Sequence, residues 1–75
     1  MPHVVVKLYS GTEQQKQALA NAVTKAMTST LNYGQGFVSV GIEDVEPKDW
    51  TENVYKPDII GKPDTIYKKP GYDPR

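Results

Sequence analysis

The chain has 75 residues, no cysteine and one histidine, and its nine basic and nine acidic side chains give a formal charge of zero. The length fits one small domain. The lack of cysteine argues against a disulfide framework, the single histidine argues against a metal site, and the balanced charge argues against a nucleic-acid-binding surface. No apolar run is long enough for a transmembrane helix or a secretory signal, so we expect a cytoplasmic protein that binds no membrane. We expect residues 1–75 to form a single domain, and a chain this short to need self-association for its stability.

The first predicted element is a strand in residues 2–9, PHVVVKLY. Its β-branched residues place apolar groups on both faces, so both faces should be covered. Pro2 directly follows Met1, and aminopeptidases readily remove an initiator methionine that precedes proline. Pro2 would then carry a free secondary amine. His3 points away from Pro2 if the strand alternates, and we expect it at the surface or in an interface.

The next segment predicts a helix from about Glu13 to Leu31. Ser10 and Gly11 suit a turn, Thr12 suits the N-cap, and Gln15 three residues later completes a capping box. The apolar residues of the helix recur at steps of three and four. They form one stripe that we expect to be core: Leu19, Ala22, Val23, Ala26, Met27 and Leu31.

A second strand is predicted in residues 37–42, FVSVGI, after a helix end at NYGQG, where Asn32, Gly34 and Gly36 tolerate a positive φ. Two residue sets alternate along this strand: Val38, Val40 and Ile42 on one face, and Phe37, Ser39 and Gly41 on the other. Strand, helix and strand predict an α+β fold, a βαβ unit with two parallel strands and one long helix. One helix covers only one face of the sheet, so a second copy of the chain should cover the other.

The last third predicts an irregular C-terminal segment. EPKDW is typical of a turn that presents Trp50, and DTIYKKPGY suits a brief helical turn or strand that packs on a neighbour. Only short turns or helical pieces fit the breakers that follow Trp50, which are Pro57, Gly61, Pro63, Pro70, Gly71 and Pro74. We expect this tail to wrap a partner.

Four segments in this order carry a family resemblance: MPHVVVKL, EQQKQALANAVTKAM, VSVGIEDVEPKDW and IYKKPGY. Together they resemble the 4-oxalocrotonate tautomerase family, and the ending is similar to that of its small bacterial para-phenylpyruvate tautomerase (PptA) type. The resemblance implies a tautomerase/MIF-like fold whose sheet is completed by oligomerisation. Its ending favours a homodimer, and a hexamer built as a trimer of dimers comes next.

The resemblance also implies that Pro2, once N-terminal, is the catalytic base and acid. Such an enzyme moves a proton between oxygen and carbon in a small-molecule 2-keto acid. A free α-amine has a pKa of about 8, and desolvation lowers it toward neutrality, where one group can both accept and donate a proton. No cofactor is required, because the carbonyl and carboxylate of the substrate stabilise the developing enolate when donors lie near them.

The chain departs from the family pattern at its arginines. Relatives carry one arginine in the loop before the helix and one in the second strand. In this chain the loop contains Thr12 and no arginine, and the position in the second strand is Ser39. The only arginine of the chain is Arg75. A dicarboxylate substrate is therefore disfavoured, and an aromatic monocarboxylate such as phenylpyruvate is favoured. Lys7 or a tail lysine of a second subunit would then be the charge partner.

Four residues are the candidate substrate contacts: Ser39, the backbone N–H near Leu8, Trp50 and Phe37. Trp50 is equally compatible with a pocket wall beside Pro2 and with a core or interface anchor. Phe37 is more typical of packing.

Two functions remain open. The favoured one is a cofactor-independent keto–enol tautomerase, an isomerase. The alternative is a non-catalytic oligomeric module that keeps the fold and binds a small acid. N-terminal processing separates them, because a retained Met1 would acylate the nitrogen of Pro2 and remove its basicity.

Overall fold

The chain divides into two compact units. The computed structural model describes residues 1–75, and the units are Met1–Asp44 and Val45–Arg75. The first unit contains strand β1 (His3–Leu8), helix α1 (Glu13–Leu31), the 3₁₀ turn η1 (Gln35–Phe37) and strand β2 (Ser39–Asp44). The second contains the 3₁₀ turn η2 (Pro47–Asp49), the π-helix η3 (Thr51–Ile60) and the 3₁₀ turn η4 (Pro63–Thr65). A single domain of residues 1–75 stays a prediction.

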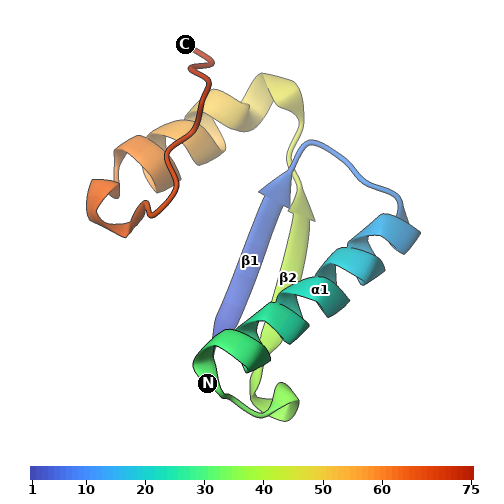
Figure 1. Ribbon diagram of the computed structural model, residues 1–75. Coiled ribbons are helices and arrows are strands. Elements are labelled where there is room, and N and C mark those ends of the chain that lie inside the picture. Colours follow the sequence, from blue (N-terminus) through green and yellow to red (C-terminus); the bar gives the residue numbers. More distant parts are fainter. The chain divides into compact units, whose positions relative to one another are not determined.

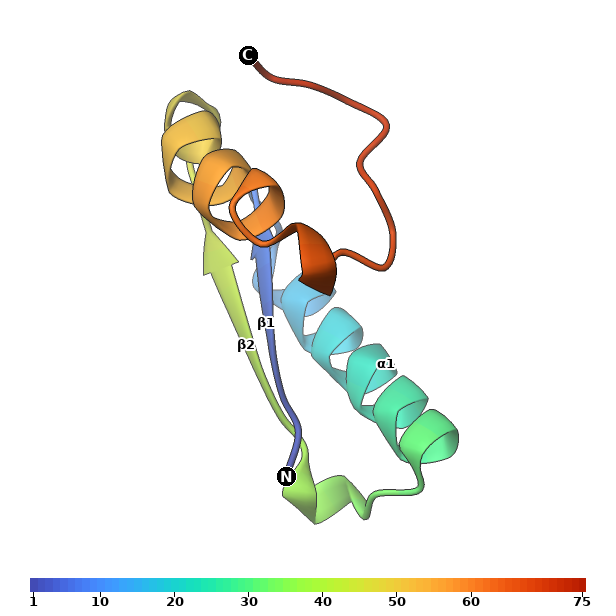
Figure 2. The same cartoon turned by 90° about the vertical axis from the view of Figure 1, so that its left-hand side faces the viewer.

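The first unit is the predicted βαβ arrangement. β1 and β2 form a two-stranded parallel sheet, in a register that runs from His3 opposite Ser39 to Leu8 opposite Asp44. Helix α1 lies along one side of the two strands (Figures 1 and 2). The predicted α+β fold is therefore confirmed. β2 begins two residues later than expected, because Phe37 closes the turn η1.

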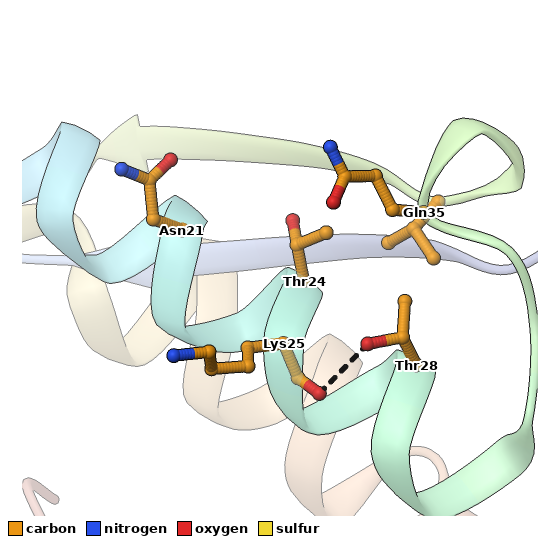
Figure 3. A pocket seen from close by; sticks show the side chains of 6 residues that line it. Asn21, Thr24, Lys25, Thr28 and Gln35 are labelled. Carbon is orange, nitrogen blue, oxygen red and sulfur yellow. Dashed lines mark hydrogen bonds between the residues drawn. The ribbon is translucent and has the colours of Figure 1, made fainter.

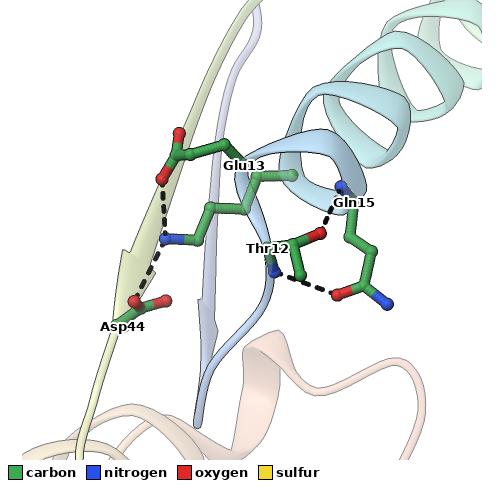
Figure 4. Close-up of polar contacts among 5 residues, drawn as sticks. Thr12, Glu13, Gln15 and Asp44 are labelled. Atoms are coloured by element: carbon green, nitrogen blue, oxygen red, sulfur yellow. Dashed lines mark hydrogen bonds and ion pairs between the residues drawn. The ribbon is translucent and has the colours of Figure 1, made fainter.

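Local signals set both ends of α1. The backbone N–H of Gln15 donates to Thr12 Oγ1 and the N–H of Thr12 donates to Gln15 Oε1, each at 3.0 Å, which is the predicted capping box (Figure 4). Asn32 ends the helix with a φ of 60°. The two glycines that were expected to share this role do not, since no glycine has a positive φ.

One lysine ties the start of α1 to the end of β2. Lys16 Nζ lies 3.1 Å from Asp44 Oδ2 and 3.6 Å from Glu13 Oε1, so two carboxylates flank one ammonium (Figure 4). The hydrogen bond to Asp44 is the main cause that raises the pKa of Lys16. The lysine therefore keeps its charge at neutral pH and fixes the helix against the carboxyl end of β2.

The sheet is covered on one face only. Side chains alternate along the strands, and the half-buried Val4, Val6, Val40 and Ile42 share the side of the helix. On the other face Val5 is 46% exposed, and a Cβ added at Gly41 would meet nothing within 4 Å. The only buried residues of the chain are Val54 and Tyr55, both in the second unit. This incomplete sheet suggests oligomerisation.

The helix stripe that we expected to be core is covered only in part. Val23 and Met27 are half-buried, but Leu19 is 37% and Leu31 is 51% exposed, and the alanines between them are exposed too. The prediction is wrong for these positions within one chain. Two strands about 4.8 Å apart are narrower than a helix of about 10 Å, so part of a broad apolar stripe extends beyond the sheet.

The second unit contains more helix than the sequence predicted. η3 runs for ten residues with Pro57 inside it, whereas only short helical pieces were expected. It ends at Gly61, whose N–H donates to the carbonyl of Lys56, five residues back, at 2.8 Å. The i→i+5 bonding of a π-helix is rare, and the apolar spacing gives no signal for it.

Candidate active site

Pro2 lies immediately before β1 and is held against the start of β2. Its carbonyl accepts a hydrogen bond from the backbone N–H of Ser39 at 3.2 Å. In a β-ladder the nitrogen and the carbonyl of one residue point to the same neighbouring strand. The nitrogen of Pro2 is therefore directed toward the residues that enter β2. Met1, which precedes it, is 89% exposed.

Ser39 and His3 lie opposite each other in the register of the sheet. His3 Nδ1 and Ser39 Oγ are 2.7 Å apart, a short hydrogen bond on the uncovered face. Ser39 was predicted as a substrate contact, whereas His3 was expected only at the surface or in an interface. The missing signal was the register, since only a pairing of residue 3 with residue 39 brings the two side chains together.

Leu8 is separated from Pro2 and Ser39 within one chain. It is the last residue of β1, opposite Asp44, whereas Pro2 precedes the first. Five strand steps from His3 to Leu8 span about 16 Å. A contact between the backbone of Leu8 and a ligand on Pro2 would therefore have to come from another copy, and it stays a prediction.

Phe37 lies at the same end of the sheet as Pro2. It closes the turn η1 two residues before Ser39 and is 56% exposed. Its ring edge lies near Gly34, where an added Cβ would be 3.4 Å from Phe37 Cδ2. The side chain is thus available to a ligand or to a partner, and packing inside one chain does not account for it.

A polar hollow lies on the helix side of the sheet (Figure 3). Its threonine hydroxyls donate to carbonyls of their own helix, Thr24 to Ala20 at 2.8 Å and Thr28 to Lys25 at 3.0 Å. Val38 is the one apolar residue in it, so it offers little wall for an aromatic ring. The hollow is lined by Asn21, Thr24, Lys25, Thr28, Gln35 and Val38.

Trp50 belongs to an aromatic cluster of the second unit. Its indole N–H donates to the hydroxyl of Tyr72 at 3.2 Å, and the ring of Tyr72 lies 5.8 Å from that of Tyr55. The guanidinium of Arg75 lies 5.3 Å from the centre of the Tyr55 ring and 2.9 Å from Asp73 Oδ2. Within its unit Trp50 is a packing residue, and a place beside Pro2 stays a prediction.

An apolar pocket adjoins this cluster. Lys69 is its only cation. It is a tail lysine of the kind expected as a charge partner for a second subunit. The lining residues are Tyr55, Ile59, Pro63, Ile66, Lys69, Pro70 and Tyr72.

The structure brings together no group of three metal-ligating side chains, and none of its helices has the length and apolarity needed to cross a membrane.

A βαβ unit that opens with a proline beside the second strand defines the class of protein. The sequence model of the family described as "Tautomerase enzyme" matches residues 2–53, a stretch that begins at Pro2. The chain therefore belongs to the tautomerase family, and it is an isomerase of that class. The resemblance to 4-oxalocrotonate tautomerases is confirmed.

Bacterial relatives match almost the whole chain. A probable tautomerase of Xylella fastidiosa (strain 9a5c) is 41% identical over 73 residues, which cover 96% of this chain and 89% of the relative. Tautomerase PptA of Cronobacter sakazakii (strain ATCC BAA-894) is 35% identical over 75 residues, which cover 97% of this chain and 99% of the relative.

Solved structures share the fold. TomN, a 4-oxalocrotonate tautomerase homologue of the tomaymycin biosynthetic pathway, has a TM-score of 0.63 at 34% identity, over 65% of this chain and 77% of its own. The apo unfused 4-OT has a TM-score of 0.61 at 33% identity, over 64% of this chain and 80% of its own.

Proposed function

We propose that this tautomerase is a cofactor-independent keto–enol tautomerase of aromatic 2-keto acids of the phenylpyruvate kind, with Pro2 as its base and acid. The observation that carries the proposal is the position of Pro2 directly before β1, hydrogen-bonded to Ser39 at 3.2 Å. The exposure of Met1 supports removal of that residue, which leaves Pro2 with a free secondary amine.

The chemistry needs one group that shuttles one proton. The neutral amine of Pro2 takes a proton from the carbon next to the keto group, and the electrons of the broken C–H bond form an enolate. The protonated amine then returns the proton to the enolate oxygen, which gives the enol, and the reverse sequence gives the keto acid. Burial of the amine under substrate lowers its pKa from about 8 toward neutral pH, where both transfers are efficient.

The substrate class follows from the charges near Pro2. The first unit has no arginine, and the arginine of the second unit is engaged by Asp73 and Tyr55. Charge-assisted hydrogen bonds to a carboxylate contribute roughly 1.5 to 3 kcal/mol each, so a second carboxylate would be desolvated without compensation. Phe37, which is 56% exposed at the same end of the sheet as Pro2, offers apolar contact to an aryl group instead.

A homo-oligomer completes the proposed site. Leu8 would be supplied by another copy of the chain, because the length of β1 separates it from Pro2 within one chain. We favour a dimer, with a hexamer as the next candidate, because of the tail that the chain shares with its PptA relatives.

The experiment compares the rates of tautomerisation of enol-phenylpyruvate by three forms: the processed protein, its Pro2→Ala variant and protein that retains Met1. We expect Pro2→Ala to lower kcat/KM strongly and a retained Met1 to lower it further, within the roughly 100- to 10,000-fold range of general acid–base groups. On 2-hydroxymuconate, a diacid, the processed protein should be less efficient by on the order of a hundredfold.

Circular dichroism and sedimentation provide the control, since all three forms must be equally folded and oligomeric. Three equal rates would mean that Pro2 only starts a strand, and the alternative of a non-catalytic module that binds a small acid would then replace the enzyme. That alternative rests on the missing arginines.

A further inference from the structure

The side chains of His3 and Ser39 form a hydrogen-bonded pair at the end of the sheet where Pro2 lies. They lie opposite each other in the register, 2.7 Å apart, while the N–H of Ser39 is bonded to the carbonyl of Pro2. Two hydrogen bonds thus hold three residues in a constant arrangement. Both side chains are exposed within one copy of the chain, at the end of the uncovered sheet face where Pro2 lies.

The hydrogen bond between them has two possible directions, and only one leaves Ser39 able to donate. When Nδ1 is unprotonated, it accepts the single hydroxyl proton of Ser39, so the hydroxyl has none for a ligand. When Nδ1 carries a proton, in the imidazolium or in the neutral Nδ1–H tautomer, Nδ1–H donates to Oγ instead. The Ser39 hydroxyl is then free to donate, and in the imidazolium the His3 Nε2–H is a second free donor on a ring that carries a positive charge.

A carboxylate is bound best by the imidazolium state. It has two oxygens that accept hydrogen bonds, and it is stabilised by a nearby positive charge. The other cations of the first unit are not placed to supply this charge. Lys16 is held by Asp44 and Glu13, and Lys25 lies in the hollow on the opposite side of the sheet. Lys7 shares the face of His3 but is four strand steps away, about 13 Å.

We propose that His3 and Ser39 together recognise the carboxylate of the substrate, with the His3 imidazolium in place of the arginine that the first unit lacks. This inference rests on the proposed function, since it needs a ligand bound at Pro2. It assigns to His3 contact with the substrate and to Ser39 a donor role that requires a proton on Nδ1 of His3.

The charged groups that share the uncovered face are few. Along β1 the next is Lys7, and along β2 it is Glu43, opposite Lys7 in the register, about 13 Å from His3. The amine of Pro2 is the remaining titratable neighbour. Helix α1 adds none, because it lies on the other side of the sheet.

The test measures inhibition constants rather than turnover. Phenylacetate, an unreactive aryl carboxylate, and phenylacetamide, its neutral counterpart, compete with enol-phenylpyruvate on the processed protein and on His3→Asn, Ser39→Ala and Lys25→Gln. We expect His3→Asn to weaken phenylacetate by at least about tenfold and to leave phenylacetamide unchanged, as for loss of a charge-assisted hydrogen bond. Ser39→Ala should give a smaller loss in the same direction, and KM should rise more than kcat falls.

The pH dependence separates a charged role from a structural one. Phenylacetate should bind the unchanged protein more tightly as the pH falls and His3 becomes protonated, and this trend should be weaker in His3→Asn. The amine of Pro2 is present in both proteins, so the difference between the two profiles belongs to His3. Lys25→Gln, which removes the cation of the hollow, should behave as the unchanged protein does.

Three other outcomes would each contradict the role proposed for a particular residue. If His3→Asn is folded and still prefers phenylacetate, His3 does not recognise the carboxylate, and a loss in Lys25→Gln would move that role to the hollow. If His3→Asn does not fold, an unchanged preference in Ser39→Ala is enough to reject the proposal. If the protein shows no turnover, calorimetry measures the binding of phenylacetate and phenylacetamide directly. A preference for phenylacetate that depends on His3, in a protein without tautomerase activity, would refute Pro2 as the base but retain the carboxylate site.

Discussion

Arg75 is the one arginine of the chain, and its guanidinium is engaged within the second unit. Its Nη2 lies 2.9 Å from Asp73 Oδ2, and its Nε and backbone N–H both donate to Asp73 Oδ1 at 3.0 Å. The Tyr55 ring lies against the same guanidinium. These hydrogen bonds favour the charged carboxylate and lower the pKa of Asp73 from 3.8 to about 2.

The first prediction concerns the titration of Asp73. Because its pKa is lowered in the folded chain, the contact with Arg75 is fully present above pH 3.8 and is lost as the pH falls toward about 2. The carboxyl carbon signal of Asp73 in NMR should therefore have its midpoint near 2, and the Tyr55 ring signals should move with it. Arg75→Gln should return the midpoint toward 3.8. An unshifted midpoint in the original protein would contradict the contact.

The residues of the candidate site were predictable from the sequence where a local pattern determines their position. Pro2 and Ser39 were both selected, and the parallel pairing of their strands places them in contact. His3 was not selected for the site, because alternation gives the face of a side chain but not the residue opposite it. Leu8 was grouped with Pro2 by resemblance, although the length of β1 separates the two within one chain.

At the scale of elements, the bounds of a helix can be predicted from the sequence when residues at its ends form capping hydrogen bonds. The bounds of α1 were predictable because Thr12 and Gln15 form a capping box and Asn32 takes a left-handed conformation. The π-helix η3 was not predictable, because it contains Pro57 and lacks a clear amphipathic period. Its end is defined sterically: a Cβ on Gly61 would lie 2.7 Å from the carbonyl oxygen of Pro57 and 2.9 Å from that of Lys56.

The second prediction is that Gly61→Ala destabilises the second unit. Those distances are shorter than real Cβ contacts, and backbone atoms must shift to relieve them, so we expect a loss of about 1 to 3 kcal/mol. Amide hydrogen exchange in residues 51–60 should become faster, while exchange in α1 changes little. Gly71→Ala is the matched control, since its added Cβ meets nothing within 4 Å. Equal exchange rates in both variants would show that the end of η3 accommodates a side chain.

At the scale of the whole molecule, very little of the chain is buried within one copy. Val54 and Tyr55 are its only buried residues, and neither belongs to the βαβ unit. A chain of this size buries only about 60% of the surface of its unfolded form. The uncovered sheet face and the exposed part of the α1 stripe are the surfaces that a second copy can cover.

The third prediction is therefore a stable oligomer, with a dimer as the first expectation. Sedimentation at micromolar concentration should give a multiple of the 8.4 kDa chain mass. Val5→Lys, on the uncovered sheet face, should weaken association because it places an unpaired charge in a desolvated interface. Lys48→Gln, which changes a well-exposed side chain of η2, serves as the comparison. A compact and stable monomer under these conditions would refute the prediction.

The hydrogen bond from Trp50 to Tyr72 has a practical consequence. Trp50 is the only tryptophan of the chain, and it lies in the second unit, so the βαβ unit contains no indole. Tryptophan fluorescence should therefore report on the second unit, while far-ultraviolet circular dichroism is weighted toward the longer helix α1. Denaturation followed by both signals would tell whether the two units unfold in one step or in succession.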